Sequence, residues 1–119
     1  MQRFSFVVTV FTLFAVSLAA QEVFTPGDGV SLPTVVTQVR PQYTEAAKAA
    51  RIEGDVVMQA VVLADGTVGD VAVTKSLDSV NGLDEQAVTA LKLWVFEPGT
   101  KDGKPVAVRI YVQSRFTLK

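Results

Sequence analysis

Strict alternation of hydrophobic positions predicts two long β-strands in the second half of the chain. The first strand carries hydrophobic residues at every second position, namely Val56, Met58, Ala60 and Val62. Its other face is hydrophobic as well, at Val57, Val61 and Leu63. A strand that is apolar on both faces is predicted to be central in its sheet. The last stretch alternates in the same way through Val106, Val108, Ile110, Val112, Phe116 and Leu118, which predicts one buried and one solvated face.

A tight turn at Asp65-Gly66 is predicted to connect the central strand to a return strand. This residue pair readily adopts the positive backbone dihedrals that a two-residue hairpin requires. The return strand carries Val68, Val71 and Val73. Gly69-Asp70 interrupts its alternation, and we expect a β-bulge there.

Two helices are predicted on either side of this hairpin. Thr44 is an N-cap candidate for a helix from Glu45 to about Arg51, a stretch rich in alanine. The second helix is opened by Leu83-Asp84, and it spaces its buried residues at three- and four-residue intervals, namely Ala87, Ala90, Leu91 and Trp94. Pro98 prevents that helix from continuing.

The predicted order is therefore helix, strand, strand, helix, strand. This order describes an α+β fold in which two helices pack on one face of a three-stranded antiparallel sheet. A sheet of this size with a covering layer is about the smallest that is independently stable.

The N-terminus predicts export from the cytoplasm. Residues 1–20 combine one positive charge with a long apolar run and a small-residue end, which is typical of a cleaved signal peptide. An uncleaved signal anchor is the alternative, because the run is just long enough to cross a bilayer. Residues 21–39 are predicted to form an extended lead-in or linker, in which Pro33 allows only a short edge strand. Residues 40–119 form the predicted domain.

Composition excludes several classes of function. The chain has no cysteine, no histidine and a net charge of −1. These features disfavour a disulfide scaffold, nucleic acid as a partner, and a site for a metal or another cofactor. The candidate catalytic residues are Lys75-Ser76 and two carboxylate pairs, Glu53 with Asp55 and Asp65 with Asp70. Lys75 and Ser76 point to opposite faces of a strand, so a small secreted enzyme is the least favoured hypothesis and no small-molecule substrate is expected.

A series of short motifs resembles the TonB C-terminal domain family in order and spacing. The motifs are Arg40-Pro41-Gln42-Tyr43, Arg51-Ile52-Glu53-Gly54, Val56, Asp65-Gly66, Val68, Ser76, Leu83-Asp84, Ala87, Trp94-x-Phe96-x-Pro98, Asp102-Gly103 and Phe116. The resemblance spans about residues 40–119. It implies a protein-binding module of the Gram-negative cell envelope, located in the periplasm, that is not an enzyme.

The resemblance also implies how such a module binds. It captures an extended segment of an envelope partner, such as the TonB box of an outer-membrane receptor, as an additional strand on its last strand, in TonB-dependent transport across the outer membrane. The residues before the first helix approach the same partner. The implied partner-binding residues are Arg40, Pro41, Gln42, Tyr43, Val108, Arg109, Ile110, Tyr111, Val112, Gln113 and Arg115.

Several alternatives remain open on the sequence alone. Arg109, Tyr111 and Arg115 also fit an ordinary solvated sheet face. A weak homodimer through the last strand is expected, because related domains share terminal strands. A full transducer of this family needs a histidine in a membrane helix and a long spacer. The chain shows neither, so we expect a standalone periplasmic domain, with a minimal transducer anchored in the inner membrane as the alternative.

Overall fold

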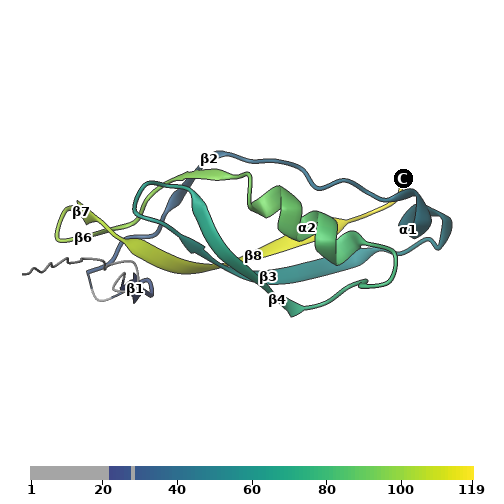
Figure 1. Cartoon of the computed structure of the whole chain (residues 1–119), viewed down its shortest axis with the longest axis horizontal. Helices are drawn as coiled ribbons and strands as arrows, with labels where there is room; N and C mark the ends of the chain where they lie inside the picture. The colour runs from purple at the N-terminus through teal and green to yellow at the C-terminus, as the bar shows by residue number, and fades with distance from the viewer. Residues whose placement is uncertain (1–21, 28) are drawn as a thin grey trace, which may run out of the picture.

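A four-stranded sheet with the strand order β1-β8-β3-β4 runs through the protein (Figure 1). The computed structural model describes residues 22–27 and 29–119. The strands of this sheet are β1 (Val23–Phe24), β3 (Gly54–Val62), β4 (Val68–Lys75) and β8 (Ala107–Phe116). The N-terminal segment that the sequence predicts to be a signal peptide or anchor lies outside the described residues. Within the described part, no helix is both long and apolar enough to cross a membrane.

The central position predicted for the strand through residues 56–63 is confirmed, and the observed strand is β3. β3 pairs antiparallel with β8 from Gly54 opposite Phe116 to Val62 opposite Val108, and antiparallel with β4 on its other side. Its burial alternates as the hydrophobic pattern predicts, because Val56, Met58, Ala60 and Val62 are buried and the residues between them are half-buried.

The predicted hairpin and bulge are present, but the turn is not the predicted two-residue type. Only Gly66 of the pair has a positive φ, at +89°, and the Leu63 N–H donates to the Thr67 carbonyl, so the loop holds residues 64–66. The Asp65 carboxylate accepts hydrogen bonds from the Thr67 backbone N–H and hydroxyl. Ala60 pairs with Val71 and Val62 pairs with Val68, so β4 carries one more residue than β3 between these pairs. The extra residue falls at Gly69-Asp70, as expected for a β-bulge.

Both helices contribute to one core on the same face of the sheet (Figure 1). Helix α1 (Glu45–Ala49) is capped by Thr44, whose side chain accepts a hydrogen bond from the Ala47 N–H at 3.1 Å. Helix α2 (Leu83–Leu91) runs across the sheet face. The buried cluster consists of Ala47, Val56, Met58, Ala60, Leu83, Ala87, Leu91 and Phe116. The α+β fold with two helices on one face is thus confirmed.

The loop before α2 is ordered by two carboxylates. Asp84 Oδ1 accepts the backbone N–H groups of Leu77 at 2.9 Å and Asp78 at 3.0 Å. The Ser76 hydroxyl donates to the other oxygen of the same carboxylate. The buried Asp78 in turn accepts backbone N–H groups that include that of Asn81 at 2.9 Å. Gly82, the helix N-cap, has a φ of +92° and has no side chain to cap the helix. The carboxylates of Asp78 and Asp84 instead accept hydrogen bonds from the backbone N–H groups before the helix.

One sequence prediction is wrong in detail. The three- and four-residue spacing predicts Trp94 on the buried face of the second helix, but α2 ends at Leu91. The Leu93 N–H donates to the Ala90 carbonyl and the Trp94 N–H donates to the Leu91 carbonyl, so the last turn tightens to three-residue hydrogen bonds. Trp94 therefore stands after the helix, where it leads into β5 (Val95–Glu97).

The predicted lead-in is extended and pairs with the domain through two short strands and through a single β-bridge between Val30 and Lys101. β1 pairs in parallel with the start of β8, where Val23 lies opposite Ala107 and Phe24 opposite Val108. This adds one short parallel strand to the predicted three-stranded antiparallel sheet. β2 (Thr34–Thr37) pairs antiparallel with β5. A small hairpin of β6 (Thr100–Lys101) and β7 (Lys104–Pro105) turns through Asp102 and Gly103.

Candidate functional site

The outer edge of β8 is open along most of its length. The inner edge pairs with β3 from Val108 to Phe116. The outer edge pairs with β1 at Ala107 and Val108, and from Arg109 to Phe116 it has no strand partner within residues 22–27 and 29–119. An unpaired edge presents backbone N–H and C=O groups that an additional strand can satisfy.

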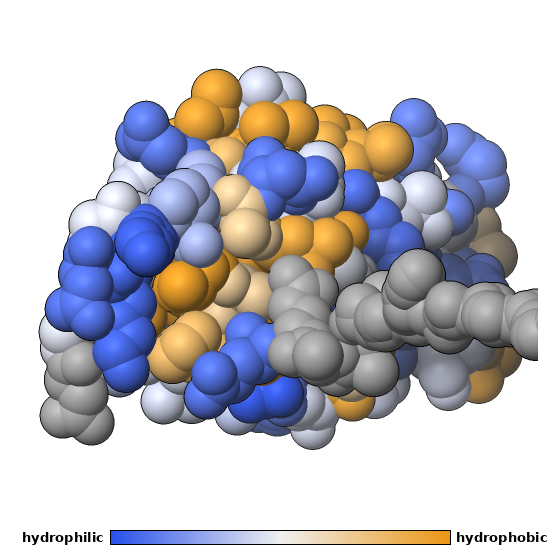
Figure 2. All heavy atoms as spheres, turned by 60° about the vertical axis from the view of Figure 1, so that its left-hand side comes forward, coloured by the Kyte–Doolittle hydropathy of each residue, from blue (hydrophilic) through white to orange (hydrophobic). Residues whose placement is uncertain are grey.

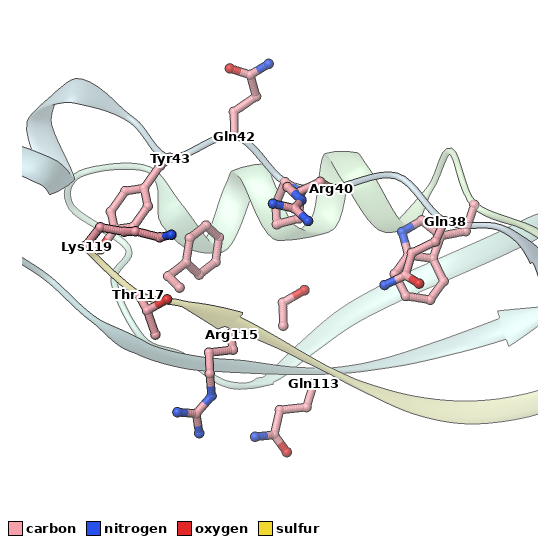
Figure 3. A pocket seen from close by; sticks show the side chains of 12 residues that line it. Gln38, Arg40, Gln42, Tyr43, Gln113, Arg115, Thr117 and Lys119 are labelled. Carbon is pink, nitrogen blue, oxygen red and sulfur yellow. The ribbon is translucent and has the colours of Figure 1, made fainter.

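A groove of about 1020 Å³ lies beside the C-terminal half of this edge. One wall is the segment between β2 and α1, and the other wall is the end of β8 with the C-terminal tail (Figure 3). Its lining residues are Gln38, Arg40, Pro41, Gln42, Tyr43, Trp94, Gln113, Ser114, Arg115, Phe116, Thr117 and Lys119. Two segments far apart in the sequence therefore meet at one site.

The wall formed by residues 38–43 is held at both of its ends. Trp94 Nε1 donates a hydrogen bond to the Val39 carbonyl at 2.9 Å. At the other end, the Tyr43 hydroxyl donates to the Ile52 carbonyl, and the Tyr43 ring meets the Phe116 ring edge to face, with centroids 5.5 Å apart. Desolvation of the hydroxyl, followed by the negative charge of Glu53, raises the pKa of Tyr43, so this ring remains a neutral donor. The groove is thus preformed.

The groove lining is cationic. It contains Arg40, Arg115 and Lys119, and no aspartate or glutamate is among its lining residues. Arg115 is partly neutralised, because its Nη2 donates to Asp55 Oδ2 at 3.1 Å and its Nε lies 3.1 Å from Oδ1. Both partners are accessible to solvent, so the pair contributes little to stability. The remaining positive charge favours a segment that carries a carboxylate.

Side chains along the end of β8 point to opposite sides of the sheet. Gln113 and Arg115 point away from Arg40 and Tyr43 (Figure 3). Phe116 follows Arg115 in the strand, so its side chain points to the other side of the sheet, where it is buried in the core below the groove. An additional strand on this edge would therefore place alternate side chains in the groove and on the open face of the sheet.

The other sequence-predicted binding residues lie outside the groove lining. Val108 is fully buried, and its outer edge is occupied by β1, so its side chain is not accessible. Ile110 and Val112 pack against the core from the helix face. Arg109 borders a separate hollow of about 130 Å³ over β3 and β4. Tyr111 is 66% exposed on the open face.

Sequence reasoning missed part of the groove, namely Gln38, Trp94, Ser114, Phe116, Thr117 and Lys119. The sequence predicts Trp94 and Phe116 as core residues, and both contact the core. For Gln38 and Lys119 the hydrophobic pattern carries no signal, because both are polar residues at the margins of the predicted elements.

Four of the candidate catalytic residues, namely Glu53, Asp55, Asp65 and Ser76, have hydrogen-bonding or ionic partners in the structure. The Ser76 hydroxyl donates to Asp84, and hydrogen bonds from Thr67 lower the pKa of Asp65 in its turn. Asp55 pairs with Arg115, and Glu53 accepts the Leu118 N–H at 2.7 Å. Across the described ranges, no cluster of three or more histidine, cysteine or acidic side chains is placed to hold a metal ion.

Comparison with known proteins adds independent information. The family model described as Gram-negative bacterial TonB protein C-terminal matches residues 39–118. The chain is 37% identical over 94 residues to Protein TonB of Vibrio cholerae serotype O1, a match that covers 76% of this chain and 37% of the relative. It is 35% identical over 78 residues to Protein TonB of Escherichia coli strain K12, covering 66% of this chain and 32% of the relative.

A solved structure shows the same fold. The solution NMR structure of the Pseudomonas aeruginosa TonB CTD superposes with a TM-score of 0.61 and 26% sequence identity, covering 80% of this chain and 93% of the other. The matches to the curated relatives span about a third of the length of those proteins. The likeness therefore concerns their C-terminal domain.

Proposed function

Because the chain belongs to the TonB C-terminal domain family, we propose that it is a periplasmic binding module that captures an extended segment of an envelope partner on the outer edge of β8. The open stretch from Arg109 to Phe116 carries this proposal. The family is one of binding and energy-transducing proteins, so we assign a binding role and no catalytic step.

Main-chain hydrogen bonds to β8 supply most of the affinity in this scheme. Strand addition satisfies the backbone groups of both partners and is largely independent of the sequence of the incoming segment. β1 blocks Ala107 and Val108, so the added strand pairs with β8 only after this point. The captured segment therefore spans at most the length from Arg109 to Phe116.

The groove supplies selectivity. A segment that pairs with the end of β8 runs beside residues 38–43, which Trp94 and Tyr43 hold in place before the partner arrives. A preformed wall reduces the ordering cost of binding. The side chains of Arg40 and Lys119 favour a segment with an acidic residue at this end. In the proposed setting, the segment is a TonB-box-like stretch of an outer-membrane receptor.

The proposal is tested by NMR titration of the isotope-labelled chain with a synthetic peptide that carries the TonB box of an outer-membrane receptor from the same organism. We expect the backbone signals of Arg109–Phe116 and of residues 38–43 to shift together. A scrambled peptide of equal charge is the control for electrostatic attraction. Shifts confined to β4, the other edge of the sheet, would show that β8 is not the docking edge.

A further inference from the structure

Two neighbouring residues, Ile52 and Glu53, contact both walls of the groove. The Ile52 carbonyl accepts a hydrogen bond from the Tyr43 hydroxyl, which belongs to the wall formed by residues 38–43. Glu53 Oε2 accepts the Leu118 backbone N–H at 2.7 Å, in the C-terminal tail of the other wall. Neither Ile52 nor Glu53 lines the groove itself. The two residues therefore join the walls from outside the binding surface.

The backbone conformation just before Glu53 is set by the end of α1. The Arg51 N–H donates to the Lys48 carbonyl, and Arg51 has a φ of +56°, in the left-handed region. The Ile52 N–H donates to the Ala47 carbonyl. These two hydrogen bonds around a left-handed residue form a Schellman motif, which ends the helix. The position of Glu53 is thus fixed by this helix end on one side and by β3 on the other.

The C-terminal tail, residues 117–119, extends past the last pair of the sheet. β3 begins at Gly54, which lies opposite Phe116. The Glu53 carboxylate gives Leu118 the acceptor that a strand backbone would otherwise provide. Thr117 and Lys119, on either side of Leu118, line the groove. The tail therefore continues the direction of β8 and lengthens the wall (Figure 1).

The contact between Glu53 and Leu118 is exposed to solvent. Such a hydrogen bond adds little to the free energy of unfolding of the whole domain, because water competes for both partners. Its acceptor is a carboxylate, and charge-assisted hydrogen bonds are short and directional. The effect of the contact is therefore local, since it restricts the positions available to the tail.

We propose that Glu53 is a positioning residue of the binding site. By holding Leu118, it fixes the tail wall and keeps Lys119 at the end of the groove. Lys119 and Tyr43 lie at this same end (Figure 3). The Glu53 side chain itself touches no part of the captured segment, because it stands outside the groove lining.

The held lysine determines which segment fits this end of the groove. Arg115 is paired with Asp55, so Lys119 is better placed to receive a carboxylate of the captured segment. Exposed hydrophobic side chains gather elsewhere, along the upper margin of the molecule in Figure 2, the margin where β2 lies in Figure 1. Recognition at the tail therefore depends on charge. This inference rests on the proposed function, and two measurements separate the two.

The first measurement follows the tail without any partner. Glu53→Ala removes the acceptor, whereas Glu53→Gln removes the same charge but keeps an oxygen that can accept the Leu118 N–H. In the isotope-labelled chain, we expect faster hydrogen exchange of Leu118 and lower heteronuclear NOE values at residues 117–119 in Glu53→Ala only. The urea midpoint should stay close to that of the original chain. Equal loss in both variants, or no loss in either, would overturn the proposal.

The second measurement uses TonB-box peptides that carry glutamate or glutamine at the first or at the last position. In the original chain, one of these positions should favour glutamate by about two- to five-fold, as for an exposed ion pair. Glu53→Ala and Lys119→Gln should each lose this preference and still bind the glutamine peptides, while Glu53→Gln should keep it. A preference that is unchanged in Glu53→Ala would overturn the positioning role. If the original chain binds no peptide, the proposed function fails, and the tail measurement alone decides whether Glu53 holds the wall.

Discussion

The Trp94 indole donates a hydrogen bond to the backbone carbonyl of Val39, 55 residues earlier in the chain, at 2.9 Å. This contact joins the end of α2 to the segment that forms one wall of the groove. Trp94 also tilts against Phe96, with ring centroids 5.9 Å apart, so its position is fixed by the core. The wall beside the open edge of β8 is therefore positioned by a core residue.

Trp94→Phe should loosen that wall without unfolding the domain. The ring keeps much of its packing, but the Val39 carbonyl loses its donor, which costs about 1 kcal/mol of the free energy of unfolding. Urea denaturation measures this loss, and hydrogen exchange of residues 38–43 should become faster. The exposed neighbour Lys92→Ala serves as control. Unchanged exchange in Trp94→Phe would mean that the hydrogen bond does not hold the wall.

Gly66→Ala should destabilise the fold more than the same change at another turn glycine. A Cβ at Gly66 would lie 2.1 Å from the Phe96 carbonyl oxygen, and φ there is +89°. Gly103 is a matched control, because its φ is +79° but its Cβ would meet no atom within 4 Å. Gly103→Ala should cost about 1 kcal/mol for its dihedral alone, and Gly66→Ala clearly more. Equal urea midpoints for the two variants would contradict the close approach of β5 to the hairpin.

The main sheet and its turns could be predicted because their determinants are local. Alternation from Val56 to Val62 identified the central strand, and Gly69-Asp70 marked the bulge. The end of α2 could not be predicted from local sequence, because no residue between Leu91 and Pro98 forbids a further helical turn. What ends the helix is the three-residue hydrogen bonding after Ala90 and the pairing of β5 with β2.

The groove could be predicted only in part. The resemblance to a known family pointed to residues 40–43 and to the last strand as separate contributors. Their meeting at one groove depends on the Trp94–Val39 hydrogen bond and on the Tyr43–Phe116 contact, which join residues distant in sequence. The parallel pairing of β1 with β8 was not expected either, because a strand of two residues has no detectable periodicity.

Asp84→Asn should reduce the dependence of stability on acidic pH. Burial raises the pKa of Asp84, but hydrogen bonds from Asp78, Ser76 and Leu77 outweigh burial and lower it below its ordinary value of 3.8. A depressed pKa means that the carboxylate stabilises the fold above the ordinary value, and that this contribution is lost as pH falls through the folded-state pKa. Free energies of unfolding between about pH 2 and 5 should therefore fall less steeply in Asp84→Asn. Ser76→Ala removes one hydrogen-bond donor to Asp84, so its pH dependence of the free energy of unfolding should lie between those of Asp84→Asn and the original chain. Parallel pH profiles for Asp84→Asn and the original chain would show that Asp84 does not stabilise the fold in this way.

A proline at Val112 should weaken partner capture more than a proline on the other edge of the sheet. Proline removes a backbone donor and is tolerated mainly on edge strands. Val112 lies on the open stretch of β8 and Val73 on the edge strand β4, and both residues lie opposite Met58 of β3. Loss of one or two main-chain hydrogen bonds, at about 0.5–1.5 kcal/mol each, corresponds to roughly a tenfold loss of affinity for the TonB-box peptide. Isothermal titration calorimetry of variants with native-like circular dichroism measures the affinity, and Ile110→Pro should repeat the result of Val112→Pro. If folded Val112→Pro binds as tightly as Val73→Pro, β8 does not receive the segment.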